Sequence, residues 1–267
     1  MLTRNDIPVL PSDPPVARVA YGADPNQFAD LRLPAGTGKW PIVAIFHGGC
    51  WAEFADATYA APVATALTRE GWATWNVEYR RIHQPGGGWP GTFDDAARGL
   101  DALREAAREH RLDLSRVVVI GHSAGGQLAL WTAAQASFSV RGAVSIGGLP
   151  DLAVFAANPG SCEDRVLRVM GGSPAEVPDR YALVSPAARL PLRIPQVLLW
   201  GELDPIAPRR LFAEYETRAA AAGDPVASIE IPGAGHHELM HPDFDSYKVL
   251  VSELQRLCGA AWQAARR

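Results

Sequence analysis

Short apolar runs alternate along this chain with longer segments in which apolar residues recur every three or four positions. Six of the short runs are rich in β-branched and aromatic residues and predict buried strands, at 40–46, 72–79, 117–120, 140–147, 196–201 and 226–231. Strands that alternate with helices favour a mainly parallel sheet with helices on both faces, which is the α/β class. We therefore expect one α/β domain over residues 1–267.

Two other segments add detail to this outline. Residues 16–33 predict an antiparallel hairpin at an edge of the sheet, with its turn at 22–26. A helix is expected to begin at Thr92 and Asp95, which form a capping-box-like pattern. Its apolar positions, from Phe93 to Ala107, recur at helical spacing and mark a face that packs on the core.

One junction between strand and helix carries the pattern of a nucleophile. The strand at 117–120 leads directly into Gly121-His122-Ser123-Ala124-Gly125, and a helical pattern follows. Gly121 and Gly125 lack Cβ atoms, so the strand and the helix can crowd together while Ser123 occupies a sharp turn. Free backbone N–H groups at a helix N-terminus favour developing negative charge. We predict that Ser123 is a catalytic nucleophile.

An acid and a base follow later in the chain. The strand at 196–201 runs into Asp204, and the strand at 226–231 leads through a glycine turn to His236. In this scheme His236 takes the proton from Ser123, while Asp204 orients His236 and stabilises its charged form. The chain order Ser, Asp, His differs from the orders of the two large serine protease families.

Each of these loops also contains alternatives. Glu202 could be the acid, although its place nearer the end of the strand suits a structural carboxylate. His237 and His241 compete with His236 for the role of the base. The glycines before His236 favour a tight turn that swings this imidazole toward the serine, whereas His241, beside a proline, fits a surface or capping role.

The strand at 40–46 ends in His47-Gly48-Gly49-Cys50-Trp51. Acyl transfer builds an oxyanion, and backbone N–H groups that follow this strand can meet it together with the N–H of Ala124. We predict that Gly49, Cys50 and Ala124 form the oxyanion hole. His47 is interpreted as a residue that braces the loop.

Together these motifs resemble the α/β-hydrolase family that includes kynurenine formamidase (arylformamidase) and related feruloyl-esterase-like and carboxylesterase enzymes. The segments that carry the resemblance are His47 to Trp51, Tyr79-Arg80, Gly121 to Gly125, Gly201 to Pro205 and Gly233 to His236. The similarity runs from about residue 27 to the C-terminus. It implies the α/β-hydrolase fold and the Ser-His-Asp triad, and it is much less specific for substrate.

Residues 148–193 separate two predicted strands and are too long for a plain crossover, so we expect a lid-like insertion over the mouth of the site. Leu149 and Phe155, with Leu152 and Met170, either line an apolar substrate pocket or pack the insertion against the body of the domain. Trp51, beside the oxyanion loop, is expected to touch substrate.

The basic pair Arg80-Arg81 follows the strand at 72–79. One of these guanidinium groups could hold a substrate carboxylate. A bracing contact with a carboxylate or with backbone carbonyls of neighbouring loops is the alternative that we favour.

Composition narrows the function classes. A net charge of −4 and a pI near 6.0 give no electrostatic case for binding nucleic acid or an anionic membrane surface. The N-terminus is polar, without the apolar run of a secretory signal, and no stretch approaches the length of a transmembrane helix. Three cysteines, Cys50, Cys162 and Cys258, form an odd set without metal spacing, which favours reduced thiols in a cytoplasmic enzyme.

We conclude from the sequence that the chain is a serine hydrolase that cleaves small carboxylic esters through an acyl-enzyme, with no metal and no cofactor. An arylformamidase acting on N-formylkynurenine and a small exopeptidase are the enzymatic alternatives. A ligand-binding protein on an inactive hydrolase scaffold is the non-enzymatic one. The expected partner is a small ester or amide, and the pattern leaves a homo-oligomer open.

Overall fold

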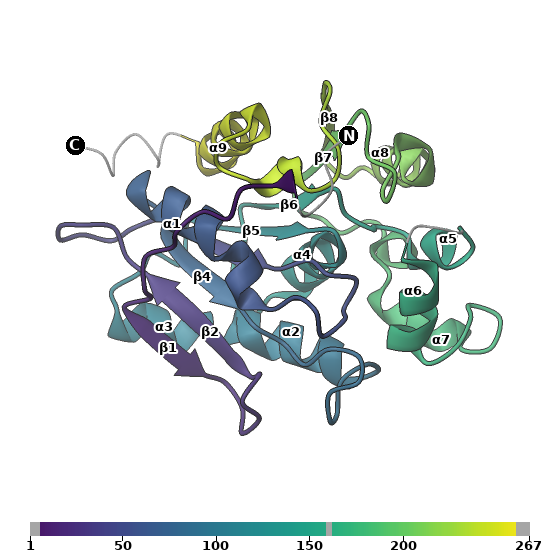
Figure 1. Ribbon diagram of the computed structural model, residues 1–267, viewed down its shortest axis with the longest axis horizontal. Coiled ribbons are helices and arrows are strands. Elements are labelled where there is room, and N and C mark those ends of the chain that lie inside the picture. Colours follow the sequence, from purple (N-terminus) through teal and green to yellow (C-terminus); the bar gives the residue numbers. More distant parts are fainter. Residues whose placement is uncertain (1–5, 159–161, 260–267) are drawn as a thin grey trace.

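The computed structural model describes residues 6–158 and 162–259. Eight strands in this part of the chain form one sheet in the order β1-β2-β4-β3-β5-β6-β7-β8 (Figure 1). They are Ala17–Ala20 (β1), Phe28–Arg32 (β2), Ile42–Phe46 (β3), Ala73–Val77 (β4), Val117–His122 (β5), Gly142–Ile146 (β6), Gln196–Gly201 (β7) and Val226–Ile231 (β8). Strand β2 is antiparallel to both neighbours, and every pair from β4 to β8 is parallel. The predicted parallel sheet with an antiparallel edge hairpin is confirmed.

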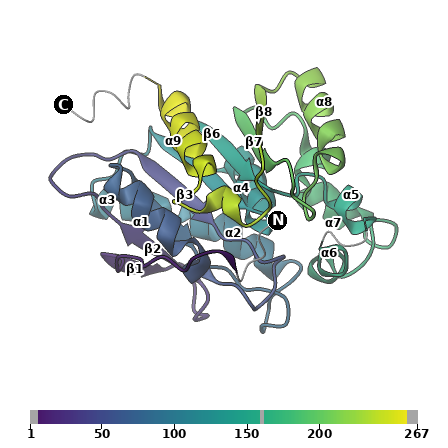
Figure 2. The ribbon, with the colours of Figure 1, turned by 45° about the horizontal axis from the view of Figure 1, so that its top comes forward.

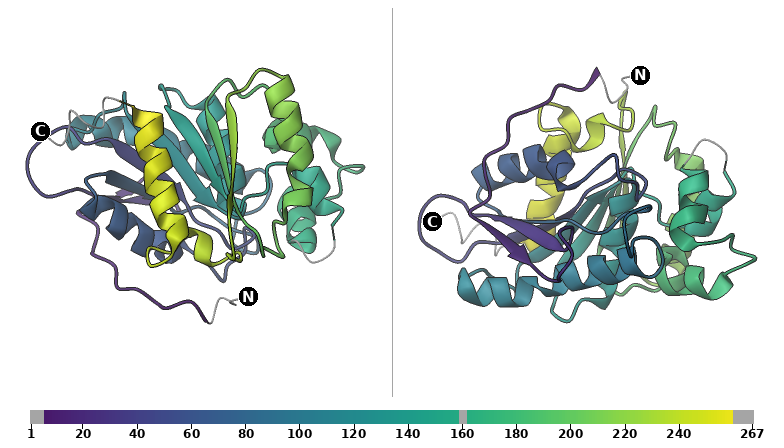
Figure 3. Two further views of the ribbon diagram at one scale, coloured as in Figure 1. Left: turned by 90° about the horizontal axis from the view of Figure 1, so that it is seen from above. Right: turned by 60° about the horizontal axis from the view of Figure 1, so that its bottom comes forward.

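Helices cover both faces of this sheet (Figures 2 and 3). The α-helices are Ala61–Arg69 (α1), Gly91–Asp101 (α2), Leu103–Glu109 (α3), Ala124–Gln135 (α4), Leu152–Ala156 (α5), Glu163–Met170 (α6), Pro178–Val184 (α7), Ala213–Ala221 (α8) and Asp245–Cys258 (α9). Short 3-10 turns span Ala57–Ala60 (η2), Pro186–Arg189 (η3), Arg209–Leu211 (η4) and Glu238–Met240 (η5). Helices α1 and α9 pack on one face, and α2, α3, α4 and α8 pack on the other.

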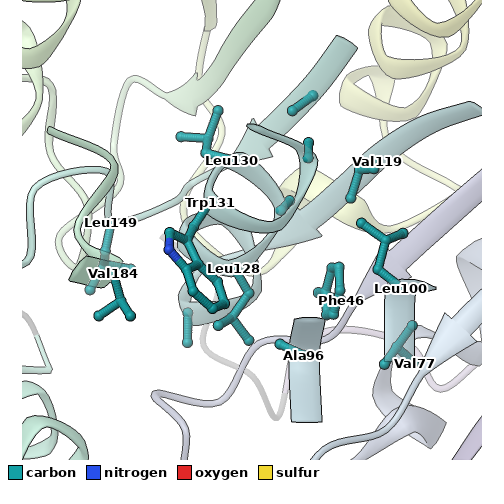
Figure 4. Close-up of a cluster of buried hydrophobic side chains, with 14 of the residues drawn as sticks. Phe46, Val77, Ala96, Leu100, Val119, Leu128, Leu130, Trp131, Leu149 and Val184 are labelled. Carbon is teal, nitrogen blue, oxygen red and sulfur yellow. The ribbon is translucent and has the colours of Figure 1, made fainter. Parts of the chain in front are cut away.

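The central strands are buried on both sides because their side chains alternate between the two helical layers. In β3, Val43 and Ile45 belong to the cluster that includes α1 and α9, whereas Phe46 belongs to the cluster that includes α4. Figure 4 shows the cluster that includes α4, where Leu128 and Trp131 of this helix lie among side chains of the sheet and of the insertion. This packing fixes the carboxyl ends of β3 and β5 beside each other.

The helix predicted to begin at Thr92 and Asp95 starts differently from the prediction. It starts at Gly91, its N-cap residue Pro90 makes no side-chain capping bond, and it breaks at Ala102 into α2 and α3. The hydroxyl of Thr92 instead donates to the carbonyl of Arg80, at 2.5 Å. The carboxylate of Asp95 also binds Arg80. The prediction of a capping box is therefore wrong, because the side chains of Thr92 and Asp95 both bind Arg80 instead.

The insertion at 148–193 contains α5, α6, α7 and η3 and lies beside α4 and α8 (Figure 1). Two side chains of α4 hold it in place: Gln127 Nε2 donates to the carbonyl of Val184, at 2.8 Å, and Trp131 Nε1 donates to that of Leu183, at 2.9 Å. The insertion therefore packs as part of the core. Among the helices of residues 6–158 and 162–259, none is long and apolar enough to cross a membrane.

Candidate active site

Ser123 lies at the turn between β5 and α4 with a strained backbone. Its φ of 55° and ψ of −121° are rare for a residue with a Cβ atom. Two backbone bonds hold the turn: the N–H of Ser123 donates to Ile146 at 2.8 Å, and its carbonyl accepts from Gly126 at 2.8 Å. Ser123 is the N-cap residue of α4, so the first N–H groups of that helix surround it.

Gly121 and Gly125 of the elbow must be glycines, because neighbouring backbone atoms lie too close to leave room for a Cβ atom. A Cβ at Gly121 would lie 2.0 Å from the carbonyl oxygen of Gly125. A Cβ at Gly125 would lie 2.2 Å from the carbonyl oxygen of Phe46. Strand β5, helix α4 and the end of β3 therefore meet more closely than any side chain allows, as the sequence pattern predicts.

Asp204 and His236 form a buried pair on the loops that follow β7 and β8. Nδ1 of His236 lies 2.7 Å from Oδ2 of Asp204, and the two residues are each 3% exposed. The other carboxylate oxygen accepts from the N–H groups of Ile206, at 2.8 Å, and Ala207, at 2.9 Å. Burial opposes ionisation of Asp204, but the contact with His236, helped by these two N–H groups, outweighs it and lowers the pKa of the carboxyl.

Because Nδ1 of His236 faces Asp204, Nε2 is the ring nitrogen that lies on the side away from this carboxylate. The backbone also approaches the pair closely at Gly147, where a Cβ would lie 3.2 Å from His236 Nδ1 and 3.3 Å from Asp204 Oδ2. Two of the competing residues, Glu202 and His241, have other partners. Glu202 accepts from the N–H of Gly233 at 2.9 Å, and His241 binds the carbonyl of Pro8 at 2.9 Å.

His122, inside the elbow, supports the histidine loop. Its Nε2 lies 2.9 Å from the carbonyl oxygen of His236, and its Nδ1 lies 3.0 Å from the hydroxyl of Tyr59. Burial, reinforced by the nearby His236, lowers the pKa of His122 to about 3. The ring is therefore neutral at physiological pH, so Nε2 donates to the carbonyl and Nδ1 accepts from Tyr59. His122 therefore has a structural role, supporting the loop that carries His236.

The loop after β3 turns back on itself directly beside the serine. Gly49, Cys50 and Trp51 have consecutive positive φ angles of 106°, 48° and 54°. At Gly48, a Cβ would lie 3.2 Å from the Cβ of Ser123, so this loop touches the elbow. Within the described residues, the N–H groups of Gly49 and Cys50 donate to no other backbone or side-chain group.

A buried carboxylate, Glu78, holds this loop in place. It follows β4 and accepts from the N–H of Ala57, at 2.7 Å, while its other oxygen lies 3.2 Å from Nε2 of His47. The ring of His47 stacks on Tyr79 with centroids 4.3 Å apart, and the Tyr79 hydroxyl donates to the His47 carbonyl at 2.8 Å. Burial raises the pKa of Glu78, but His47 and Arg81 outweigh it, and the pKa is lowered. No local pattern in the sequence marks Glu78, because Ala57 and His47 lie far from it in the chain.

The basic pair after β4 has bracing contacts. Arg80 forms two parallel hydrogen bonds with Asp95, at 2.7 and 2.8 Å. Arg81 donates to the carbonyl of Ala55 and, at 3.0 Å, to the side chain of Asn26. Since these contacts occupy both guanidinium groups, the bracing interpretation is confirmed and the substrate-carboxylate alternative is not supported.

Two cysteines form a disulfide, which contradicts the prediction of reduced thiols. Cys50, in the loop after β3, is bonded to Cys162 at the start of α6, across a sequence separation of 112 residues and with a Cα–Cα distance of 5.8 Å. Cys258 is the free cysteine and is buried. The sequence could not indicate the pairing, because it depends on how the insertion folds back onto the loop after β3. The predicted cytoplasmic location rests on reduced thiols, so the disulfide removes that basis.

The structure also corrects the predicted substrate contacts of Trp51, Leu149 and Phe155. All three side chains are 0% exposed and belong to the large core cluster, as do Leu152 and Met170. Figure 4 shows Leu149 beside Val184 and Trp131. The alternative in which these residues pack the insertion against the body is the one that the structure supports.

The cavity at the serine has a volume of about 90 Å³. Besides Ser123, His236, Gly49 and Cys50, its walls are formed by Phe54, Ala55, Tyr59, His122, Ile206 and His237. No residue of the segment 148–193 that the structure describes lines this cavity. The insertion therefore flanks the site, tied to it through the disulfide and through Arg165, whose guanidinium lies 5.4 Å from the centre of the Phe54 ring.

This sheet order, with a serine elbow, a buried Asp–His pair and a glycine-rich loop at the carboxyl ends of its strands, defines the class of carboxylesterase-type α/β-hydrolases. The model of the BD-FAE family, an esterase family within this class, matches residues 29–213. The chain belongs to the BD-FAE family.

Curated relatives match only part of the chain. A probable isoprenylcysteine alpha-carbonyl methylesterase, ICMEL1 of Oryza sativa subsp. japonica, is 29% identical over 115 residues, which are 43% of this chain and 26% of the relative. The uncharacterized peptidase YtmA of Bacillus subtilis (strain 168) is 26% identical over 112 residues, or 42% of this chain and 44% of that protein. The chain therefore spans less than half the length of these relatives.

Solved structures match over nearly the whole chain. A bacterial heroin esterase superposes with a TM-score of 0.72 and 26% identity, covering 90% of this chain and 81% of that one. A truncated carbohydrate esterase from gut microbiota gives a TM-score of 0.79 at 19% identity, covering 92% of this chain and 97% of that one. The second likeness is evidence for the fold alone.

Proposed function

We propose that this protein hydrolyses small carboxylic esters through an acyl-enzyme, with Ser123, His236 and Asp204 as its catalytic triad. The observation that carries the proposal is the buried contact of 2.7 Å between His236 Nδ1 and Asp204 Oδ2, in a cavity whose walls include both His236 and Ser123. Membership of an esterase family supports the substrate class.

In the first half of the reaction, Ser123 Oγ attacks the ester carbonyl and His236 Nε2 takes the hydroxyl proton. Asp204 is held by two backbone N–H groups and keeps the imidazole in one orientation, and its negative charge stabilises the imidazolium that forms. The N–H groups of Gly49, Cys50 and Ala124 receive the oxyanion. One such donor is typically worth about 3 kcal/mol of transition-state stabilisation.

Collapse of the tetrahedral intermediate breaks the bond between carbonyl carbon and ester oxygen, and His236 returns its proton to the departing alcohol. Water then attacks the acyl-enzyme with His236 as the base, and the carboxylic acid leaves. The buried His122 is neutral and holds the carbonyl of His236, so it positions the base without exchanging protons in the reaction.

The test is hydrolysis of p-nitrophenyl acetate, butyrate and octanoate, with N-formylkynurenine measured alongside. Ser123→Ala is expected to lower turnover of the esters by roughly four orders of magnitude. Ser115→Ala removes a hydroxyl outside the cavity and should leave the rate unchanged. A fluorophosphonate probe should label the wild type on Ser123 and leave the Ser123→Ala variant unlabelled.

Each other outcome points to a different function. Much faster turnover of N-formylkynurenine than of the esters would move the assignment to an arylformamidase. A folded Ser123→Ala variant that keeps a tenth of the activity would overturn the triad. If the folded wild type hydrolyses none of these substrates, the result would favour an inactive ligand-binding scaffold over an enzyme.

A further inference from the structure

A second and larger cavity, of about 320 Å³, lies beside the cavity at the serine. The two share the walls formed by Phe54, Ala55, Tyr59 and His237. The remaining walls of the larger cavity come from the N-terminal residues 7–10, from η2 and its N-cap residue, from α1 and from the loop around η5. Most of them are apolar side chains.

The N-terminal wall is tied down at both ends. We define residues 7–13 as the N-terminal strap, which runs past α1 toward β1 (Figure 1). At one end the carbonyl of Pro8 accepts from His241 Nε2, at 2.9 Å. At the other, the N–H of Asp13 donates to Thr65 at 2.9 Å, and its carboxylate pairs with Arg69 at 2.9 Å. These anchors hold the intervening Val9 at the cavity.

Two of the large apolar side chains at this cavity face solvent. Val9 is 97% exposed and Phe54 is 51% exposed. Exposed apolar surface is unfavourable in water, and a ligand that covers it recovers that free energy. The walls thus suit an apolar group, and the carboxylate of Asp56, which also lines the cavity, disfavours an anionic one.

The position of the cavity identifies which half of an ester it would hold. His236 must deliver its proton to the departing oxygen, so the alcohol lies on the histidine side of the serine. Met240 and His241 follow His236 in the same loop, and both line the larger cavity but not the cavity at the serine. That cavity therefore lies on the side of the leaving group.

The two volumes set the size of each half. The cavity at Ser123, of about 90 Å³, is the smaller and suits a short acyl group. The cavity of about 320 Å³ lies within the range of pockets that hold small organic ligands, about 300–1,000 Å³, and suits the bulkier half of the ester.

We propose that the larger cavity binds the leaving group, and that the enzyme selects esters that join a short acyl group to a neutral, apolar alcohol of aryl size. The N-terminal strap is one wall of this specificity site. The proposal rests on the esterase function given above and adds a substrate class to it.

The experiment compares kcat/KM for three substrates: methyl acetate, 2-naphthyl acetate and 2-naphthyl octanoate. Methanol is too small to reach the second cavity, so methyl acetate reports the triad alone. In the wild type, the naphthyl acetate should be cleaved at least tenfold more efficiently than the octanoate. Two variants alter the cavity wall. Thr58→Trp fills the space, and Val9→Asp adds a charge at an exposed position that the fold does not need.

Both variants should lower kcat/KM for 2-naphthyl acetate at least fivefold and change that for methyl acetate less than twofold. Val16→Asp is the matched control, because Val16 is also exposed, at 59%, but lines neither cavity. Equal effects of the variants on both acetates would overturn the leaving-group site and leave the esterase intact. A loss confined to the octanoate would also overturn it, because the cavity would then hold the acyl chain. Failure of the wild type to cleave any ester would instead contradict the esterase function itself.

Discussion

The disulfide between Cys50 and Cys162 predicts a large and measurable dependence of stability on reduction. The bond closes a loop with a sequence separation of 112 residues. In the chain-entropy model, a loop of this length restricts the unfolded chain by about 16 cal/mol/K, which is about 4.8 kcal/mol at 25 °C. Cys162→Ser should therefore lower the free energy of unfolding by up to about that amount. With a urea m-value of about 3 kcal/mol/M, the midpoint falls by about 1.6 M.

The same change should reach the active site, because Cys50 contributes one of the proposed oxyanion donors. The contacts of Glu78 with Ala57 and His47 remain after reduction, so the loop keeps part of its position. Turnover should fall by no more than roughly 100- to 1,000-fold, the effect of losing one donor. A larger loss would mean that the disulfide alone holds the loop.

The assay is urea unfolding of the wild type with and without reductant, alongside the variant. Thiol titration in urea should count one thiol before reduction and three afterwards, since the chain has 3 cysteines. Cys258→Ala is the control: it removes the buried free thiol and should keep the full sensitivity to reductant. Three titratable thiols in the unreduced protein, or a midpoint that reduction does not move, would refute the reasoning.

Four further changes test other parts of the structure. Gly125→Ala should leave little folded protein in a solubility and circular dichroism assay, because its Cβ would lie 2.2 Å from the Phe46 carbonyl oxygen. Glu78→Ala should cost about 3–5 kcal/mol in urea unfolding, as for other broken buried ion pairs; a loss under 1 kcal/mol would contradict its bracing role. The folded-state pKa values of Glu78 and Asp204 are lowered, so their stabilisation is complete above pH 5 and is lost as pH falls below about 4. A urea midpoint that is flat down to pH 3 would count against both. With a pKa of about 3, His122 stays neutral above pH 5, so His122→Asn should keep the shape of the pH–rate profile even where it lowers the rate.

The sequence predicts the sheet correctly and points to the triad candidates because both depend on local patterns. Gly121 and Gly125 flank Ser123 within a few residues, and the apolar runs of the strands are visible one by one. Residues that act through long-range packing stay hidden. Glu78 meets Ala57 and His47 only after β3 and β4 pair, so no spacing in the chain marks it.

Two of the errors have a common origin in the insertion. Leu149 and Phe155 are apolar, and apolar residues occur both in substrate pockets and in the core. Only the packing of α5 against the body of the domain shows that these two belong to the core. The pairing of Cys50 with Cys162 depends on the same packing. The residues that do line the cavities, such as Phe54, come from loops whose path the pattern of apolar positions does not describe.

The order of the strands in the sheet has a consequence for how this enzyme gains activity as it folds. Gly49, Ser123, Asp204 and His236 follow β3, β5, β7 and β8, and β6 must lie between β5 and β7 before the loops can meet. Pairing of parallel strands over such sequence distances is slow, because the loops must close before the contacts form. During refolding, secondary structure can therefore form before the molecule has any catalytic activity. The recovery of hydrolysis therefore reports the last step of folding. When circular dichroism shows that half of the protein has refolded, we expect the rate of hydrolysis to be much less than half of the rate of the native protein.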